Sequence, residues 1–118
     1  MNLQKLVSQC VEYAEKHGVA AYEVVTNYRN TNRLYDKTYT LFKELKSSGR
    51  EGLDALRNLL EHPNDYVRAK AAIFLLSVDT DKARKILEEM SNRPGIFGFS
   101  MSMTLKEWDK GNLTDYLG

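Results

Sequence analysis

The stretch HPNDYVRAKAAIFLLSVD, residues 62–79, decides the fold class. Pro63 prevents a preceding helix from continuing, and Asn64 or Asp65 can cap a new one, because these side chains accept hydrogen bonds from the free N–H groups of a first helical turn. Small and aliphatic residues then recur at helical spacing: Val67, Ala71, Ala72 and Leu75. The stretch therefore predicts a turn followed by a buried helix, with Arg68 near the start of that helix.

Helical patterns flank this stretch on both sides. Residues 52–62 (GLDALRNLLEH) carry leucines at three- and four-residue steps, and residues 81–91 (DKARKILEEMS) repeat an apolar line after a second turn. Residues 97–110 (FGFSMSMTLKEWDK) predict a last helix that ends at Gly111. The region after residue 50 therefore reads as two helical hairpins, each of which has to bury one face against its neighbour.

The N-terminal part of the chain predicts further helices. Residues 1–18 carry an apolar stripe that Gly18 is expected to end, and a short helical piece follows at residues 19–25 (VAAYEVV). The polar stretch after it predicts a break near Asn30, because Asn and Thr favour caps and turns. A helix then resumes over residues 33–46 and ends in SSGREG.

No segment shows the alternation of a strand, so the sequence predicts an all-α protein of about six helices. Its 118 residues fit a single domain, 1–118. Within it we expect N-terminal helices over 1–48 and the two helical-hairpin repeats over 51–113. Trp108, the one tryptophan, is expected to hold the last helix against this stack.

The central stretch resembles a HEAT repeat. The resemblance rests on the leucine-rich helix, the turn with Pro63 and Asp65, and the Val67-Arg68 pair followed by small residues. It implies a HEAT-like stack in which Arg68 is structural and reaches an acidic or carbonyl group of an adjoining turn. By sequence, Asp65 and Asp79 are the nearest candidate partners.

A narrower resemblance covers nearly the whole chain. It is carried by NRLYDK (32–37), HPNDYVRAKAA (62–72) and MTLKEWDKGNL (103–113). These motifs are similar to those of small bacterial HEAT-like proteins classed as a domain of unknown function. Such proteins also resemble, in fold and size, the immunity proteins that neutralise bacterial toxins by covering them.

Composition limits the expected location and partners. The net charge of +1 provides no overall field that would draw the protein onto nucleic acid or an acidic membrane. The single cysteine, Cys10, cannot form an internal disulfide, which suits a reducing compartment. The N-terminus lacks the apolar core of a sorting signal, and no window approaches the roughly 20 apolar residues of a membrane span. We expect a cytoplasmic protein without a membrane association.

No pattern indicates catalysis, a cofactor or a metal. His17 and His62 have no partner at ligand spacing, and Cys10 lies on an apolar stripe where an inert thiol is expected. Residues 94–99 (PGIFGF) have two glycines before a helix but lack the strand and the Lys-Ser/Thr ending of a phosphate loop. The glycines therefore favour close packing. We expect no catalytic, cofactor-binding or metal-binding residue.

Charge is distributed unevenly along the chain. Residues 27–50 carry six basic and two acidic side chains, a net charge of +4, whereas residues 51–118 carry nine basic and eleven acidic ones, a net charge of −2. Tyrosines accompany the basic residues, and Tyr with Arg is a combination that protein interfaces favour. Single-stranded nucleic acid also binds aromatic and basic residues together. A plain solvent-exposed face is a third interpretation.

These observations predict a protein-binding module, with an immunity protein that binds a toxin domain as the specific hypothesis. Its partner site would combine two helices, with residues Arg33, Asp36, Lys37 and Tyr39 on one and Tyr66, Lys70 and Phe74 on the other. The second group could instead be the seat of the N-terminal helices. A HEAT-like nucleic-acid-binding protein is the alternative, although the near-neutral total charge weighs against it.

Overall fold

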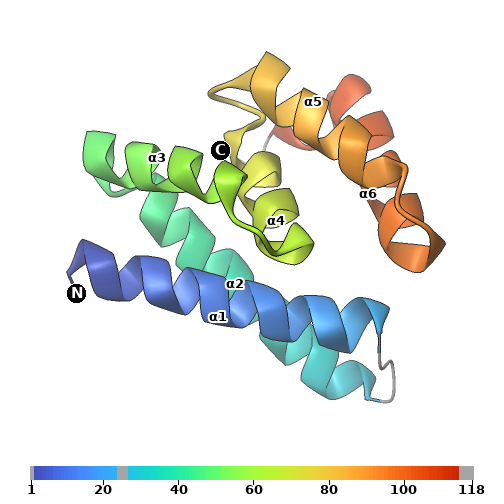
Figure 1. Ribbon diagram of the computed structural model, residues 1–118, viewed down its shortest axis with the longest axis horizontal. Helices are drawn as coiled ribbons and strands as arrows, with labels where there is room; N and C mark the ends of the chain where they lie inside the picture. Colours follow the sequence, from blue (N-terminus) through green and yellow to red (C-terminus); the bar gives the residue numbers. More distant parts are fainter. Residues whose placement is uncertain (1, 24–26, 115–118) are drawn as a thin grey trace.

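The computed structural model describes residues 2–23 and 27–114. These residues form six α-helices and one short 3-10 helix, η1, and none of them belongs to a strand (Figure 1). The expected all-α class with six helices is confirmed. In chain order the elements are α1 (Leu3–Tyr22), α2 (Tyr28–Lys46), α3 (Gly49–Asn58), η1 (Leu59–Glu61), α4 (Asp65–Leu75), α5 (Thr80–Ser91) and α6 (Gly95–Asp109).

Helix α4 lies at the centre of the molecule. It packs against α1, α2 and α3 on one side and against α5 on the other, while α6 packs on α5 (Figure 1). Buried residues occupy most of its circumference: Val67, Ala69, Ala71, Ala72, Phe74 and Leu75. A helix that is apolar nearly all round needs neighbouring elements on every side. The paired helices α1 and α2 cover one side of α4.

The predicted start of α4 is confirmed. Asn64 caps the helix, and its Oδ1 accepts hydrogen bonds from the backbone N–H groups of Tyr66 at 2.9 Å and Val67 at 3.2 Å. The preceding helix, α3, continues into η1, which ends at Glu61, two residues before Pro63. The local rules for turns and caps are sufficient here, because the groups that form this boundary are neighbours in sequence.

The predicted end of the first helix is wrong. Gly18 does not stop α1, which continues to Tyr22, and the break lies between Tyr22 and Tyr28 rather than near Asn30. Part of the expected helical piece, residues 24 and 25, lies outside the described residues. Gly18 is buried against α4: a Cβ built on it would lie 2.1 Å from Cγ of Tyr66. This glycine therefore permits close approach of two helices instead of ending one.

The last helix begins earlier than predicted. α6 starts at Gly95, and Gly98, which the sequence suggested for close packing, is buried in its first turns. A Cβ on Gly98 would lie 1.8 Å from the carbonyl oxygen of Arg93, so the turn before α6 occupies the space that a side chain would need. The α5–α6 connection is therefore closed by backbone packing.

Candidate functional site

The structure separates six of the seven predicted partner-binding residues into two groups, and Tyr39 belongs to neither. Arg33, Asp36 and Lys37 are exposed on the outer side of α2, whereas Tyr66, Lys70 and Phe74 face inward from α4. Arg33 and Lys37 line an outer groove, whereas Tyr66, Lys70 and Phe74 line an inner pocket. The expected single surface is therefore not formed by these two sets of side chains.

Phe74 is the clearest correction. Only 1% of its surface is exposed, and its ring lies with its centroid 5.6 Å from those of both Tyr39 and Phe42 on α2. The expectation of a partly exposed stripe is wrong for this residue, because α2 covers it. The alternative interpretation, that the N-terminal helices pack on this stripe of α4, agrees with the structure.

Tyr66 and Tyr39 are half-buried where the N-terminal helices pack against α4 and α6 through aromatic rings, a contact region that we call the aromatic seam. The ring of Tyr66 stacks on Tyr22 and meets the edge of Phe97, and its hydroxyl donates a hydrogen bond to Glu23 at 2.6 Å. Burial, followed by this carboxylate, raises the pKa of Tyr66 to about 12. Tyr39 stacks on Tyr35. These tyrosines join the N-terminal helices to α4 and α6.

An open groove of about 830 Å³ lies between α1 and α2, on the outer side of the pair. Arg33 and Lys37 line it from α2, and Tyr13 and Lys16 line it from α1. The ammonium groups of Lys16 and Lys37 lie 5.1 and 5.8 Å from the centroid of the Tyr13 ring. The groove thus combines an aromatic ring with three basic side chains and one acidic side chain, Glu15, so its lining has a net positive charge.

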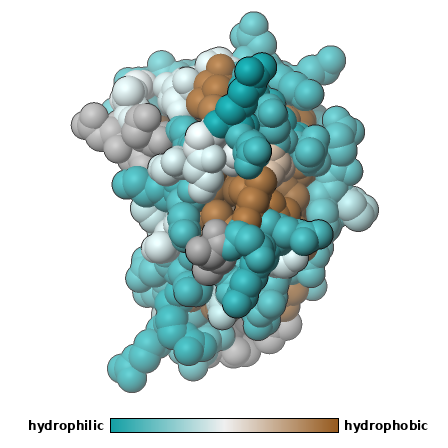
Figure 2. Space-filling model, turned by 90° about the vertical axis from the view of Figure 1, so that its left-hand side faces the viewer, coloured by the Kyte–Doolittle hydropathy of each residue, from teal (hydrophilic) through white to brown (hydrophobic). Residues whose placement is uncertain are grey.

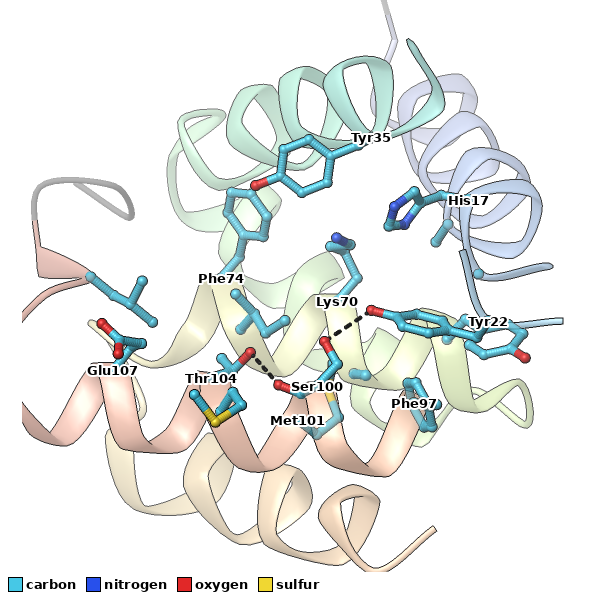
Figure 3. A pocket seen from close by; sticks show the side chains of 17 residues that line it. His17, Tyr22, Tyr35, Lys70, Phe74, Phe97, Ser100, Met101, Thr104 and Glu107 are labelled. Carbon is cyan, nitrogen blue, oxygen red and sulfur yellow. Dashed lines mark hydrogen bonds between the residues drawn. The ribbon is translucent and has the colours of Figure 1, made fainter. Parts of the chain in front are cut away.

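An inner pocket of about 420 Å³ lies between α1, α2, α4 and α6 (Figure 3). Aromatic and aliphatic side chains form most of its wall, including Tyr22, Tyr35, Phe97 and Met101. Three of its hydroxyl groups are bonded within the wall. The hydroxyls of Tyr22 and Ser100 are 3.2 Å apart, and that of Thr104 donates to the Ser100 carbonyl oxygen at 3.0 Å.

Lys70 brings a charge into this pocket. Its ammonium group points into the space between His17 and Tyr35 (Figure 3), and it lies 5.1 Å from the centroid of the Tyr35 ring. Among the described residues Lys70 has neither an ion pair nor a hydrogen bond from its ammonium group. Burial lowers its pKa from 10.5 to about 8, so the group is still mainly protonated at neutral pH.

His17 contributes no charge at neutral pH. Its pKa is lowered to about 4, mainly by burial and secondly by the positive charge of Lys70. Its ring meets the edges of Tyr22 and Tyr35. Glu107 also lines the pocket, but it lies away from Lys70, and its carboxylate accepts a hydrogen bond from Asn112 at 2.7 Å (Figure 3). Chemically, the arrangement offers one cationic donor in an aromatic wall.

A third hollow, between α1 and α3, has a different character. It is lined by Leu3, Val7, Ala55 and Leu59, with uncharged polar neighbours. Figure 2 faces the side of the molecule where α1 and α3 begin, and shows apolar surface surrounded by hydrophilic side chains. None of the described residues that line this hollow carries a charge that would select a ligand.

The two residues expected to be structural lie in contact with neighbouring elements. Arg68 donates from Nε to the Leu60 carbonyl oxygen at 3.2 Å, and its guanidinium lies 3.3 Å from a Glu89 oxygen and 3.7 Å from Asp65. Asp65 was a predicted partner. Asp79 was also suggested, but it pairs with Arg57 at 2.6 Å. Trp108 is half-buried and packs against the core.

Other side chains that attract chemical interest are placed as follows. Cys10 is fully buried, and burial raises the pKa of its thiol to about 12. His62 accepts a hydrogen bond from the Asn64 backbone N–H within its own turn. No group of three or more His, Cys, Asp or Glu side chains within residues 2–23 and 27–114 could hold a metal ion. Over the same ranges, no helix combines the length and apolar character needed to cross a bilayer.

Comparison with known proteins identifies a family. The sequence profile described as Domain of unknown function (DUF2019) matches residues 4–109, from the first turn of α1 to the last residue of α6. The chain belongs to the DUF2019 family. The resemblance to a domain of unknown function is thereby confirmed. No curated protein and no solved structure matches this DUF2019 chain.

Sequence reasoning missed the inner pocket of the DUF2019 domain. It assigned Lys70 to an outer surface and did not connect it with His17, Tyr35 or Glu107, which come from three other helices. One signal was present in the sequence: Lys70 interrupts a run of small apolar residues. A lysine in such a run indicates a charge at a largely buried helix. The side on which it emerges depends on the neighbouring helices.

Proposed function

We propose that this DUF2019 domain is a non-catalytic protein-binding module that forms a stoichiometric complex with another protein through the outer face of α1 and α2. The observation that carries the proposal is the open groove that Tyr13, Lys16, Arg33 and Lys37 line. Its basic and aromatic side chains are accessible, and interfaces favour aromatic residues and arginine. A protein surface with acidic side chains is the complementary partner.

The helix α2 extends this face beyond the groove. Residues Tyr28–Lys46 carry five basic and two acidic side chains, a net charge of +3. Arg29, Arg33 and Lys37 follow one another at four-residue steps, so they form one stripe along the helix. Tyr28 stands at its start with 79% of its surface exposed. An exposed tyrosine beside a cationic stripe is suited to anchoring a partner.

The specific form of the proposal is an immunity protein that neutralises a bacterial toxin by covering it. Its fold would be a HEAT-like stack in which α3 with α4 and α5 with α6 are the two hairpins. The contact of Arg68 with the Leu60 carbonyl oxygen supports this interpretation, because a HEAT-like arginine is expected to reach an adjoining turn. Such a protein would reside in the cytoplasm, where a toxin meets its target.

The test begins with a photo-crosslinking residue at Asp36, which is exposed beside Arg33 and Lys37. The captured partner is then titrated against the domain by calorimetry. We expect one partner per domain, and binding weakened on the order of ten-fold by Arg33→Gln with Lys37→Gln. The matched control neutralises two exposed lysines on α5, Lys82→Gln with Lys85→Gln, and should leave affinity unchanged.

A tight partner that is indifferent to both pairs of substitutions would contradict the assigned surface. Nucleic-acid binding is the second candidate, and the cationic stripe on α2 is the observation that favours it. Recovery of nucleic acid whose binding falls steeply with salt would support this alternative, because phosphate contacts release counterions. Apolar and hydrogen-bonded contacts with a protein respond less to salt.

A further inference from the structure

The inner pocket has the size and composition of a small-molecule site. Its volume of about 420 Å³ is within the usual range for ligand pockets, which is roughly 300–1,000 Å³. Four helices line it, and aromatic and aliphatic side chains form much of its wall, while the charged groups among its described lining residues are Lys70 and Glu107. Sites of this kind fix a ligand through a small number of polar contacts and bury the rest of it against apolar side chains.

Lys70 is the polar group that would select the ligand. It stands on α4 with its ammonium group directed into the pocket (Figure 3), and no carboxylate of the described residues pairs with it. An unpaired charge in such surroundings is costly, and an anion that reaches it restores the missing interaction. Glu107 does not pair with Lys70, because it lies away from the ammonium group and accepts a hydrogen bond from Asn112 (Figure 3).

The remaining donors narrow the class of anion. The hydroxyls of Tyr22, Ser100 and Thr104 are engaged within the wall, and Tyr66 donates to Glu23. Tyr35, the other hydroxyl-bearing residue of the lining, is not without a partner either. The first N–H groups of α4 are occupied by Asn64. Phosphate sites gather several donors, usually backbone N–H groups or arginine. One ammonium group matches one carboxylate instead, and Glu107 would repel a second negative charge.

The aromatic side chains define the other end of the ligand. Tyr22, Tyr66 and Phe97 form a cluster with ring centroids 5.2 to 5.9 Å apart, and Met101 lines the wall beside them. Flat rings and short alkyl chains pack well on such surfaces. We propose that the pocket binds a small monocarboxylate with an apolar body, its carboxylate on Lys70 and its body against Tyr22, Phe97 and Met101.

This inference goes beyond the proposed function, because the pocket is separate from the outer groove. The probes are phenylacetate and hexanoate, with phenylacetamide as the uncharged match. Binding to the whole chain is followed at neutral pH by amide chemical-shift changes. We expect both carboxylates to shift resonances of pocket residues. Phenylacetamide should bind on the order of ten- to a hundred-fold more weakly, since it lacks the charge-assisted contact with Lys70.

Two variants test the site itself. Lys70→Met keeps an apolar stem of similar length and should weaken phenylacetate binding on the order of ten- to a hundred-fold. Thr104→Phe adds a ring to the pocket wall and should abolish binding. Lys70→Gln serves in place of Lys70→Met if the latter does not fold. The control Lys82→Met removes an exposed lysine on α5, outside both the inner pocket and the outer groove, and should leave binding unchanged.

Three outcomes would overturn the inference. They are equal binding of phenylacetate to the wild type and a folded Lys70 variant, equal binding of phenylacetate and phenylacetamide, and absence of binding by both carboxylates at millimolar concentrations. Persistence of the shifts in a folded Thr104→Phe variant would also place the ligand elsewhere. None of these results depends on whether a protein partner occupies the outer groove, so the two proposals fail separately.

Discussion

The two sides of α4 use charge in opposite ways. Toward α5, Asp65 and Arg68 form a network with Glu89 and Arg93, in which the Arg93–Asp65 distance is 2.9 Å and the Arg68–Glu89 distance is 3.3 Å. Toward α1 and α2, the ammonium of Lys70 lies over the Tyr35 ring and forms no ion pair with any described residue. Arg68 and Lys70 are two residues apart, so the helix itself turns one to each side.

This difference separates a structural charge from an available one. The guanidinium of Arg68 has acceptors on α4, α5 and η1, and therefore ties three elements together. The ammonium of Lys70 ties none, and its seam is held by rings and glycine contacts instead. Arg68 is ion-paired between α4 and α5, whereas Lys70 forms no ion pair with a described residue. We therefore expect substitutions of these two residues to affect stability differently.

The largest expected effect comes from removing the apolar anchor of the aromatic seam. Phe74→Ala should reduce the free energy of unfolding by about 3 to 5 kcal/mol, because it leaves a cavity between α2 and α4. Urea denaturation measures this loss. The control is Phe99→Ala on α6, where 68% of the residue is exposed, and a change within about 0.5 kcal/mol is expected. Comparable losses in the two variants would contradict the seam as described.

The unpaired charge should destabilise the fold in a way that depends on pH. The pKa of Lys70 is lowered to about 8 in the folded state from 10.5, so the unfolded chain binds more protons between these values and stability rises with pH. Below pH 8, Lys70→Met should therefore be more stable than the wild type by up to about 3 kcal/mol. The advantage should disappear as the pH approaches 10.5.

Thermal denaturation of both proteins over this pH range checks the prediction for Lys70. The exposed Lys37 provides the matched control, because Lys37→Met removes a lysine without removing a buried charge. No comparable gain in stability at neutral pH is expected for Lys37→Met. A Lys70→Met variant that is less stable than the wild type at neutral pH would show that the contact with Tyr35 outweighs the cost of burial.

A smaller effect is expected where α1 approaches the aromatic seam. Gly18→Ala improves helix propensity but places a methyl group against Tyr66, so we expect a loss of about 2 kcal/mol from overpacking. Denaturant unfolding of Gly18→Ala alone and with Tyr66→Leu separates the two contributions. If alanine at this position were stabilising, the close contact between α1 and α4 would be disproved.

The smallest effect belongs to the network on the other side of α4. Arg68→Ala should cost about 1 to 2 kcal/mol, because the Leu60 carbonyl oxygen and Glu89 lose a donor. The melting temperature of Arg68→Ala measures this change. Arg68→Lys is the informative comparison, since it keeps the charge and loses the branched geometry. An unchanged melting temperature in Arg68→Ala would remove its structural role.

Local features of the chain were predictable from sequence where the interacting groups are close neighbours. The cap at Asn64, the turn at Pro63 and the buried line of α4 follow from the hydrogen-bonding capacity and spacing of adjacent residues. Asp65 was correctly suggested as a partner of Arg68 because it lies three residues away on the same helix. These expectations needed no knowledge of the other helices.

Tertiary packing decided the features that sequence reasoning placed wrongly. Glycine 18 has the local properties of a helix stop, but α4 lies against it and makes it a contact point. Phe74 has the spacing of a surface stripe, but α2 covers it. In both cases the residue type is compatible with two environments, and only the position of another helix distinguishes them.

The sequence by itself determined that this DUF2019 chain is helical, where α4 begins, and which side chains could carry charge. Only the tertiary structure decided that Arg68 is satisfied while Lys70 faces a pocket with His17 and Tyr35. The physical reason is that helix periodicity depends on residues within a turn or two, whereas solvation of a charge depends on every group that surrounds it in space.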